Sequence, residues 1–404
     1  MYPQGVNSAT FSAGPLDGSL TIPQLLDRHL ECSPDHPAYI YDDPKGNIVS
    51  IKFSQYIRAV HAAARLFLRD NLQYSRDGGA TVVALFATTG MMVAGAMRAG
   101  MVPFCISPRN AAASLANLLK EVKVAAVYVS SDLRSVLSEG IRIYGCSVLV
   151  FDAPTFAKLQ VETDVELSSE MLPPIPVASI ALDSQNERNA ESMAFRFNLN
   201  ILDASLANPW FSTEDHCGQI LGCHALPNFH GIGVLMQTWP ITSELVVAVL
   251  RPTTPPIRPT AENSLKAMIA TEPSLVLATP ANIETWSEDP IGLKFMQSLK
   301  TLSYIGATLN KCSHGKDWDY ISMREGCNIV RVPEDDGPGL YTHTYLVGPA
   351  FATTFTNAEI DGKPGCSLSD LLEQHPENPE LHRVYGRKDD LIAFSTAAKV
   401  PGQT

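Results

Sequence analysis

The chain has 404 residues, 45% of them hydrophobic and 18% charged, and carries a formal net charge of -12. This length allows a large buried core, and the composition is that of a globular protein and excludes a disordered chain. The acidic balance argues against a general surface for nucleic acid or anionic membranes, because both need clustered lysine and arginine. We therefore expect a soluble protein with neither nucleic acid nor a membrane among its partners.

The eight cysteines are scattered and form no C-x-x-C pair, so the sequence shows neither zinc-ligand spacing nor a dense disulfide framework. The first 19 residues lack the basic start and apolar core of a signal peptide. No run of about 18 apolar residues occurs, as a membrane-spanning helix would need. These features predict free thiols in a reducing compartment and a cytoplasmic protein.

The start of the chain predicts an arm, a helix, a hairpin and a second helix. Residues 1–20 are small and polar with several Gly and Pro residues, which is typical of a flexible arm. Apolar residues recur at helical spacing over 22–32, and the pattern of 38–51 indicates a hairpin. Ser54 is a good N-cap for an amphipathic helix that runs to about residue 72.

Further on, apolar runs alternate with helical patterns up to residue 151. Because parallel strands are joined by helical crossovers, this alternation predicts a layered α/β domain. We expect strands at 81–86, 101–106, 125–129 and 147–151, and helices at 91–99 and 114–121.

The second half of the chain changes character twice. The polar stretch 181–203 has little periodicity and predicts an irregular segment, whereas a strand is expected after Gln219. The prolines between 252 and 259 predict a rigid linker. Beyond residue 316 we expect short antiparallel strands as far as residue 362, then an amphipathic helix at 367–375 and a closing strand at 383–385.

Two short motifs near the end of the chain bear charged groups that suit a nucleotide. The first is Leu368-Ser369-Asp370, and the second is Tyr385-Gly386-Arg387-Lys388-Asp389-Asp390. An ionised carboxylate has only acceptors and can hold hydroxyl groups, while a guanidinium is a fixed fork of donors for phosphate. The alternatives are a turn-capping aspartate before a helix and a solvated charged turn.

Three further motifs precede these two. They are Pro227-Asn228-Phe229-His230-Gly231-Ile232-Gly233, Ala278-Thr279-Pro280-Ala281-Asn282-Ile283-Glu284, and the stretch 302–311 with Gly306-Ala307 at its centre. Taken in this order, the motifs resemble the AMP-binding, acyl-adenylating superfamily. Within it, they resemble the adenylation domain of fungal carboxylic acid reductase-like and peptide-synthetase-like proteins. The resemblance runs from about Asp35 to Lys399.

The resemblance implies an α/β fold: a large N-terminal adenylation-domain fold of layered α/β subdomains, with a small antiparallel β segment near the C-terminus and a truncated C-terminal subdomain. The implied divisions are a flexible arm at 1–20, a first α/β subdomain at 21–180, an irregular segment at 181–206, a second α/β subdomain at 207–316, a β-rich segment at 317–390 and the start of the C-terminal subdomain at 391–404.

On the nucleotide side, the resemblance implies ATP or AMP with Mg²⁺. Asp370 would hold the ribose hydroxyls, and Arg387 would contact the ribose and phosphate. Gly306 and Ala307 would lie along the purine, since only small residues let a backbone approach a ring closely. Asp389 would form the hinge of a mobile C-terminal subdomain.

On the acid side, the resemblance implies a carboxylic acid substrate and a carrier-domain phosphopantetheine thiol that acts in trans. His230 would gate the acyl pocket and approach the carboxylate, and Ala281 and Asn282 would line it. A lone histidine is more often structural, and the alternative for Ala281 and Asn282 is an ordinary strand end. We assign no metal-ligating residue, and expect His314, His343, His375 and His382 at the surface.

Two motifs of the resembled family have no counterpart here. The Gly- and Ser/Thr-rich phosphate loop is absent from 181–206, and the Tyr-Gly-x-Thr-Glu element is absent after Gly315. Three interpretations therefore stay open. The chain is an acyl-adenylating ligase with impaired turnover, a catalytically inactive nucleotide- and acyl-binding remnant, or an incomplete gene model of a multidomain adenylate-forming reductase.

Overall fold

The computed structural model divides the chain into two compact units, which are described separately. The first unit comprises residues 1–277 with 299–301, and the second comprises 278–298 with 302–404. The structure describes residues 4–15, 19–70, 81–87, 90–145, 147–161, 179–182, 195–198, 215–224, 226, 229, 231–253, 255–305, 309, 320–322, 328–334, 339–346, 356–388, 391–393 and 399–401.

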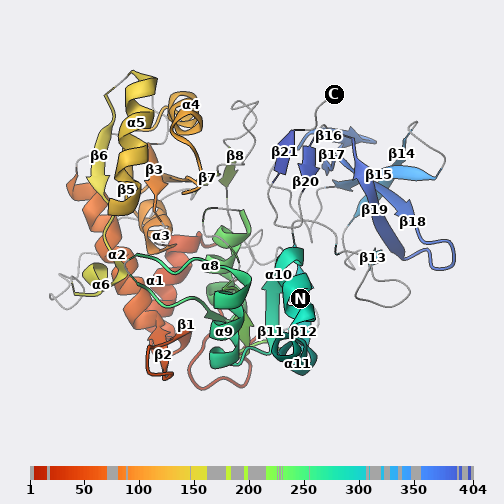
Figure 1. Cartoon of the computed structure of the whole chain (residues 1–404), viewed down its shortest axis with the longest axis horizontal. Helices are drawn as coiled ribbons and strands as arrows, with labels where there is room; N and C mark the ends of the chain where they lie inside the picture. Colours follow the sequence, from red (N-terminus) through yellow and green to blue (C-terminus); the bar gives the residue numbers. More distant parts are fainter. Residues whose placement is uncertain are drawn as a thin grey trace. The chain divides into compact units, whose positions relative to one another are not determined.

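The first unit contains a six-stranded sheet with helices along it (Figure 1). Its strands are β3 (Val82–Phe86), β4 (Val102–Cys105), β5 (Ala126–Val129), β6 (Leu149–Asp152), β7 (Ser179–Leu182) and β8 (Phe195–Asn198). The order across the sheet is β6-β5-β3-β4-β7-β8, and every neighbouring pair is parallel except β7 with β8. The predicted parallel α/β arrangement is therefore confirmed.

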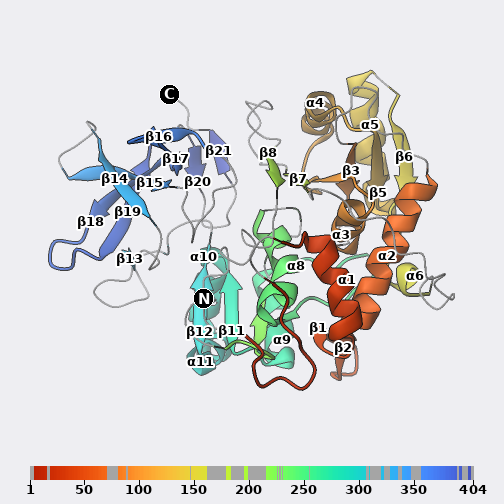
Figure 2. The ribbon, with the colours of Figure 1, turned by 180° about the vertical axis from the view of Figure 1, so that it is seen from behind.

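Helices cover both faces of this sheet, as Figures 1 and 2 show from opposite sides. They are α2 (Phe53–Arg69), α3 (Gly90–Arg98), α4 (Ala112–Val122), α5 (Arg134–Tyr144), which follows a 3₁₀ turn at Ser131–Leu133, and α6 (Phe156–Val161). Along β3, Val82 and Ala84 pack with Leu115 of α4, whereas Val83 and Leu85 belong to the cluster built on α2 and α3. Because both faces are buried, the strands are continuous apolar runs.

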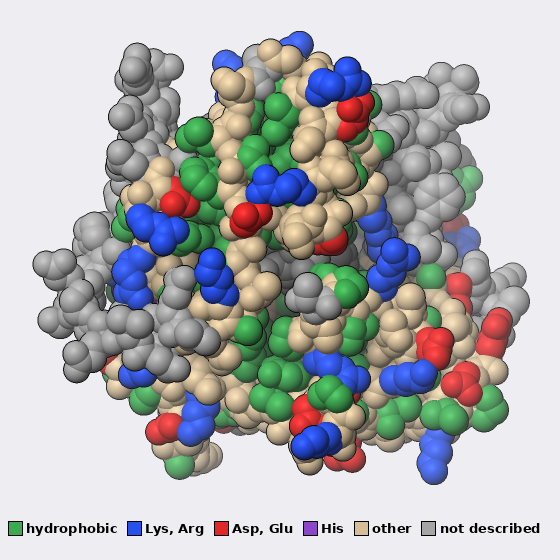
Figure 3. Space-filling model, turned by 60° about the vertical axis from the view of Figure 1, so that its left-hand side comes forward, with side chains coloured by type: hydrophobic (Ala, Val, Ile, Leu, Met, Phe, Trp, Pro, Cys, Tyr) green, Lys and Arg blue, Asp and Glu red, His purple; other side chains and the backbone are tan. Residues whose placement is uncertain are grey.

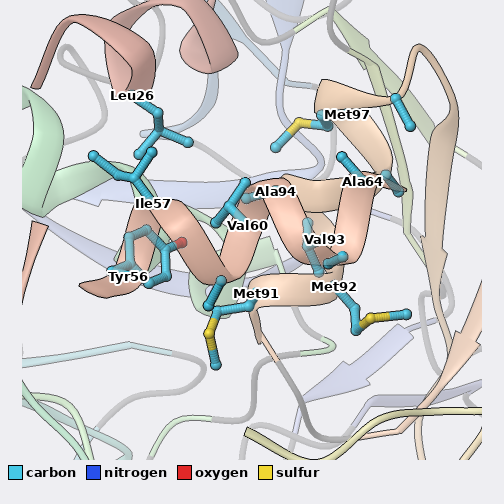
Figure 4. Packing of buried hydrophobic residues seen from close by; sticks show 14 of the residues in the cluster. Leu26, Tyr56, Ile57, Val60, Ala64, Met91, Met92, Val93, Ala94 and Met97 are labelled. Atoms are coloured by element: carbon cyan, nitrogen blue, oxygen red, sulfur yellow. The ribbon is translucent and has the colours of Figure 1, made fainter. Parts of the chain in front are cut away.

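Helices α2 and α3 pack against each other, and Figure 4 shows buried hydrophobic residues of both helices. A β-carbon added at Gly95 would lie 2.6 Å from the β-carbon of Ala63 and 3.2 Å from the backbone oxygen of Val60. Only glycine therefore fits at this crossing. Helix α2 begins at Phe53, one residue before the predicted cap Ser54, because the Gln55 side chain already accepts the backbone N–H of Lys52 at 2.9 Å.

Strands β7 and β8 correct the prediction of irregular structure beyond residue 181. The parallel edge of β4 provides backbone partners for β7, and β8 then pairs back on β7 from Phe195 to Asn198. The alternation of apolar and polar residues in Phe195-Arg196-Phe197 is a short strand pattern, which the surrounding polar sequence conceals.

A second sheet is built largely from the first unit. Its strands are β1 (Pro37–Asp42), β2 (Ile48–Lys52), β9 (Ile220–Gly222), β10 (Val246–Ala248), β11 (Leu275–Ala278) and β12 (Thr301–Tyr304), in the order β12-β11-β9-β10-β1-β2. β1 and β2 form the predicted antiparallel hairpin, while β1, β10, β9 and β11 pair in parallel. Its helices are α1 (Ile22–Cys32), α8 (Gly231–Ser243) and α9 (Ala261–Thr271).

The N-terminal arm is docked, which corrects the prediction of a flexible segment. Phe11 is only 6% exposed, and its ring lies 4.8 Å from that of His29 and 5.1 Å from that of His36. The backbone N–H of Ser12 donates to the Ser33 hydroxyl at 2.9 Å. A single aromatic anchor among small polar residues leaves no periodic pattern, so the sequence did not indicate this packing.

The second unit contains helices α10 (Pro280–Glu288) and α11 (Pro290–Ser298) and an antiparallel sheet. The sheet strands are β13 (Tyr320–Ser322), β14 (Ile329–Pro333), β15 (Leu340–Leu346), β16 (Ala358–Ile360), β17 (Lys363–Ser367), β18 (Asp370–Gln374) and β19 (Leu381–Arg387). The order is β13-β19-β18-β15-β17-β16, with β14 on β15, and β20 (Leu391–Ala393) pairs separately with β21 (Lys399–Pro401). The predicted antiparallel strands are confirmed.

The helix predicted at 367–375 is wrong, because this stretch forms the end of β17 and all of β18. Leu368, Leu371, Leu372 and His375 have the spacing of one helical face. In the sheet, however, Leu371 and Leu372 are both buried, and the register with β19 shifts between them. Leu371 and Leu372 are therefore adjacent buried residues of a strand, and with Leu368 and His375 they imitate helical periodicity.

Charged side chains of both signs are interspersed with apolar ones on the face shown in Figure 3. Among the residues that the structure describes, no helix is both long enough and apolar enough to cross a lipid bilayer.

A buried ionic group ties α1, α2 and α3 together. Asp27 of α1 accepts from Nε2 of His61 at 2.7 Å and from Nη2 of Arg98 at 2.9 Å. The Arg98 side chain is only 2% exposed. A guanidinium at this depth needs a carboxylate partner, because removing one member of a buried pair is strongly destabilising.

We predict that Asp27→Ala lowers the free energy of unfolding by about 3 kcal/mol, because it leaves the Arg98 charge buried without this carboxylate. Asp35→Ala is the matched control, since Asp35 pairs with Lys52 in an exposed salt bridge and should change stability by less than about 1 kcal/mol. Urea denaturation followed by circular dichroism measures both. Equal effects of the two substitutions would contradict the prediction.

Candidate functional site

An aspartate and an arginine face each other across two neighbouring strands of the second unit. Asp370 opens β18 and Arg387 closes β19, and the two are direct partners in the antiparallel register. Nη1 of Arg387 donates to Oδ1 of Asp370 at 2.9 Å, and both side chains are partly exposed. Asp370 is therefore a strand residue in an ion pair, and the alternative of a turn-capping aspartate before a helix is wrong.

A bulge makes this pairing possible. Leu371 pairs with Gly386, but the next residue, Leu372, pairs with Val384, so Tyr385 is an extra residue on β19. A regular ladder continued from Leu372 would place Gly386 opposite Asp370 and turn Arg387 to the other face of the sheet. Tyr385 itself points away from the buried side and is 64% exposed.

The residue after Arg387 is also held in place. The backbone N–H of Lys388 donates to the carbonyl oxygen of Ser369 at 2.7 Å, and its ammonium group forms an ion pair with Glu334. Glu334 also accepts from the Thr342 hydroxyl at 2.9 Å. These two donors lower the pKa of Glu334, so its carboxylate stays ionised. The end of β19 is thereby fixed on both sides of the Asp370–Arg387 pair.

The two described acid-side residues lie in the first turn of α10, immediately after β11. Thr279 precedes the helix with an extended backbone, Pro280 occupies its first turn, and the backbone N–H of Asn282 donates to Thr279 at 3.0 Å. Ala281 and Asn282 are both half-buried. The alternative of an ordinary strand end is therefore wrong, because β11 ends at Ala278 and both residues belong to helix α10.

The remaining predicted site residues, His230, Gly306, Ala307 and Asp389, lie outside the described residues. No group of three or more His, Cys, Asp or Glu side chains that could hold a metal ion occurs in the part of the chain that the structure describes. Among the predicted site residues that the structure describes, Asp370 supplies acceptors and Arg387 supplies donors.

His224 is a candidate that sequence reasoning missed. It follows β9 by two residues, at the carboxyl end of a parallel strand, where open α/β sheets bind ligands. It is 3% exposed, and neither ring nitrogen has a hydrogen-bond partner among the described residues. Burial lowers its pKa to about 3, so the ring is neutral. The sequence signal that could have identified His224 is its position directly after an apolar strand.

His343 and His382 are buried, at 1% exposure each, which corrects the prediction of surface histidines. Nε2 of His382 lies 3.3 Å from Nη2 of Arg331, and Nδ1 lies 2.7 Å from the Tyr341 hydroxyl. Because arginine only donates, Nε2 is the acceptor and the proton resides on Nδ1. The ring centroids of His343 and His382 are 5.4 Å apart. The sequence did not indicate this burial, because polar residues occur at alternate positions of β15.

The chain matches no protein-family profile. Its fold nevertheless matches that of acyl-adenylating enzymes. The inhibitor-bound N-terminal domain of FACL13 from Mycobacterium tuberculosis has a TM-score of 0.66 and 14% identity, over 91% of this chain and 100% of that one. The anthranilate CoA ligase AuaEII in complex with anthranoyl-AMP has a TM-score of 0.67 and 11% identity, over 94% and 79%.

Sequence comparison identifies more particular relatives. Adenylate-forming reductase Nps10 of Heterobasidion annosum is 28% identical over 99% of this chain and 41% of its own length. Adenylate-forming reductase Nps11 of Serpula lacrymans is 25% identical over 97% and 40%. The chain thus spans about two fifths of the length of these curated relatives. Sequence and fold together relate it to the adenylate-forming superfamily and, within it, to reductase-like proteins, as its motifs predicted.

The histidine pair predicts acid sensitivity. Burial, followed by the charges of His382 and Arg331, lowers the pKa of His343 to about 4, against an ordinary value of 6.5. Between these values the unfolded chain takes up a proton that the folded chain does not, so stability falls as the pH falls from about 6.5 towards 4. His343→Phe should flatten this dependence, because it removes the titrating group and keeps a ring.

Thermal unfolding measured at intervals from pH 7.5 to pH 4.5 tests this prediction. A steeper loss of stability in the parent chain than in His343→Phe is expected. The same slope in both proteins would show that His343 does not titrate as its burial demands.

Proposed function

We propose that the chain is the adenylating part of an adenylate-forming protein, and that it activates a carboxylic acid as its acyl-adenylate with ATP. The observation that carries this proposal is the Asp370–Arg387 pair, which the bulge in β19 brings together at a half-exposed strand end. The sequence relatives and the adenylating fold support it.

In this reaction a carboxylate oxygen of the acid forms a bond to the α-phosphorus of ATP, the bond to the bridging oxygen breaks, and pyrophosphate leaves. Protein side chains take little covalent part, so positioning and charge stabilisation supply the catalysis. A carboxylate that gives one oxygen to Arg387 keeps acceptor sites for two ribose hydroxyls. We assign this role to Asp370, and assign Arg387 to the ribose and phosphate.

The other roles follow the resemblance and are part of the same proposal. By the resemblance, we assign His230 to the substrate carboxylate, and Ala281 and Asn282 to the acyl group. The neutral imidazole of His224 is a polar group at the carboxyl end of β9. Gly306 and Ala307 lie along the purine, and Asp389 forms the hinge. Mg²⁺ would neutralise phosphate charge, although no cluster of three or more His, Cys, Asp or Glu side chains that could hold it occurs among the described residues. A carrier-domain thiol acting in trans would accept the acyl group.

A second candidate function is binding without turnover. The sequence lacks the phosphate loop and the Tyr-Gly-x-Thr-Glu element of the family, and loss of one preorganised donor typically costs about 3 to 4 kcal/mol of transition-state stabilisation. Several such losses would leave a module that binds nucleotide and acid but releases pyrophosphate at the background rate. We also place the protein in the cytoplasm, a proposal that rests on its scattered cysteines, of which the five described are free.

Isothermal titration calorimetry with ATP and with a non-hydrolysable acyl-AMP analogue tests the proposal. Asp370→Ala should weaken the binding of both ligands at least tenfold, because it removes the acceptor for the ribose. Glu373→Ala is the matched control: Glu373 pairs with Arg383 across the same two strands, and its loss should change affinity less than twofold. Absence of binding by the folded parent chain, or equal losses in both variants, would contradict the proposal.

A screen for acid-dependent pyrophosphate release then separates the two candidate functions. Release above background in the parent chain, lost in Asp370→Ala, indicates adenylation. Nucleotide binding without any release indicates the binding module.

A further inference from the structure

The docked N-terminal arm meets the start of β9 and β10 through a small set of polar contacts. The backbone N–H of Gly5 donates to Oδ1 of Asp215 at 3.0 Å, and the backbone N–H of His216 donates to the Gln4 side chain at 2.8 Å. Oδ1 of Asp215 also accepts the backbone N–H of Cys217 at 3.0 Å. Residues 4 and 5 of the arm are thus held by the segment that leads into β9.

Glu244 lies directly beneath this part of the arm. It sits between α8 and β10 in a left-handed conformation, with φ of 62°. The whole residue is buried, and neither carboxylate oxygen has a hydrogen-bond partner of ordinary geometry among the described residues. Its carboxyl group packs on Gly5, where an added β-carbon would lie 2.0 Å from Oε2. Gly5 has φ of +65°, so both its conformation and its contact with Glu244 require glycine.

The described groups that face Glu244 offer no balancing positive charge. Asp215 acts on it with a charge of the same sign, and the Cys217 thiol beside it is a neutral, weak donor. Nε2 of His36 lies 3.4 Å from the backbone oxygen of Glu244, but burial lowers the pKa of His36, which keeps its ring neutral near pH 7. The described part of the arm, residues 4–15, contains no Asp, Glu, Lys, Arg or His.

A carboxyl group in these surroundings keeps its proton to a higher pH than an exposed carboxyl group does. Burial and the Asp215 charge raise the pKa of Glu244 to about 7, against an ordinary value of 4.5. A neutral carboxyl group can remain under the arm, whereas an ionised one must regain water, because a buried unpaired charge is costly.

We propose that Glu244 is a proton-operated latch, which holds the N-terminal arm closed while its carboxyl group is protonated and lets the arm open when the group ionises. The closed arm binds the proton more tightly than the open arm does. Closure is therefore most favoured below pH 4.5, weakens as the pH rises, and reaches its lower limit above about pH 7. Glu244 and the arm belong to the first unit, whereas Asp370 belongs to the second.

Opening of the arm would uncover the group of rings against which Phe11 packs. Phe11 packs against His29 and His36, and its ring centroid is 6.3 Å from that of Phe53 at the start of α2. Withdrawal of the arm removes Phe11 from this group and exposes Phe53. The change in protonation of one carboxyl group is thus connected to exposure of an aromatic surface.

Hydrogen exchange of the full chain, measured by mass spectrometry from pH 5.5 to pH 8.5 and expressed as protection factors, tests the latch. In the parent chain, protection of the Gly5–Phe11 amides should fall on the order of tenfold to a hundredfold as the pH rises from 5.5 to about 7, and should level off above that pH. Amides of β3 in the core of the same unit should keep constant protection, which shows that the fold is intact.

Three variants make the test specific. Glu244→Gln keeps the shape without the charge, so arm protection should be high and independent of pH. Glu244→Gly suits the positive φ and should also show no pH dependence, which keeps the test valid if the glutamine variant does not fold. Gly5→Ala should expose the arm at every pH, because its methyl group collides with Glu244. Unchanged arm protection across this range in the parent chain, or the same pH dependence in Glu244→Gln, would overturn the proposal.

Discussion

The register between β18 and β19 is the constraint on which the proposed nucleotide site depends. One extra residue, Tyr385, leaves the ladder, and the strand beyond it is displaced so that Arg387 meets Asp370. The pair is then supported on its far side by Lys388, which bonds both to the backbone of Ser369 and to Glu334. The structure therefore prepares a carboxylate and a guanidinium as one rigid unit, as a site for a ribose and its phosphate requires. A side-chain substitution elsewhere in β18 or β19 is expected to change the stability of the fold more than the affinity for nucleotide.

The chain buries several polar groups whose surroundings decide their protonation. Asp27 and Arg98 form an ion pair at 2.9 Å. His224 and His343 have no hydrogen-bond partners among the described residues and are held neutral by burial. Glu244 retains a proton near neutral pH for the same reason. An unpaired buried polar group typically costs about 1 to 3 kcal/mol, so each of them is a point at which acidity, a ligand or a conformational change can act on the fold.

Most of the fold could be predicted from local pattern, and the failures have physical causes. Continuous apolar runs separated by helical patterns indicated the parallel sheet, because strands buried on both faces lose their alternation. The helix predicted at 367–375 was wrong because Leu371 and Leu372 are adjacent residues of β18 that are both buried, which imitates the spacing of a helical face. Asp370 and Arg387 were identified by their motifs, but their pairing depends on a register that no motif encodes. The burial of His343 and the docking of the arm on Glu244 depend on contacts between distant segments, which local periodicity does not report.

The most direct test of the account compares the binding of ATP with that of 2′,3′-dideoxy-ATP, in the parent chain and in Asp370→Asn. If Asp370 holds the ribose hydroxyls, the parent chain binds ATP at least tenfold more tightly than the dideoxy analogue, because the analogue has no hydroxyl groups to donate to the Asp370 carboxylate. In Asp370→Asn the two nucleotides should then bind with similar affinity. Equal affinity of the parent chain for both nucleotides, or an undiminished preference for ATP in the variant, would show that the Asp370–Arg387 pair is a structural feature of the sheet and not a nucleotide site.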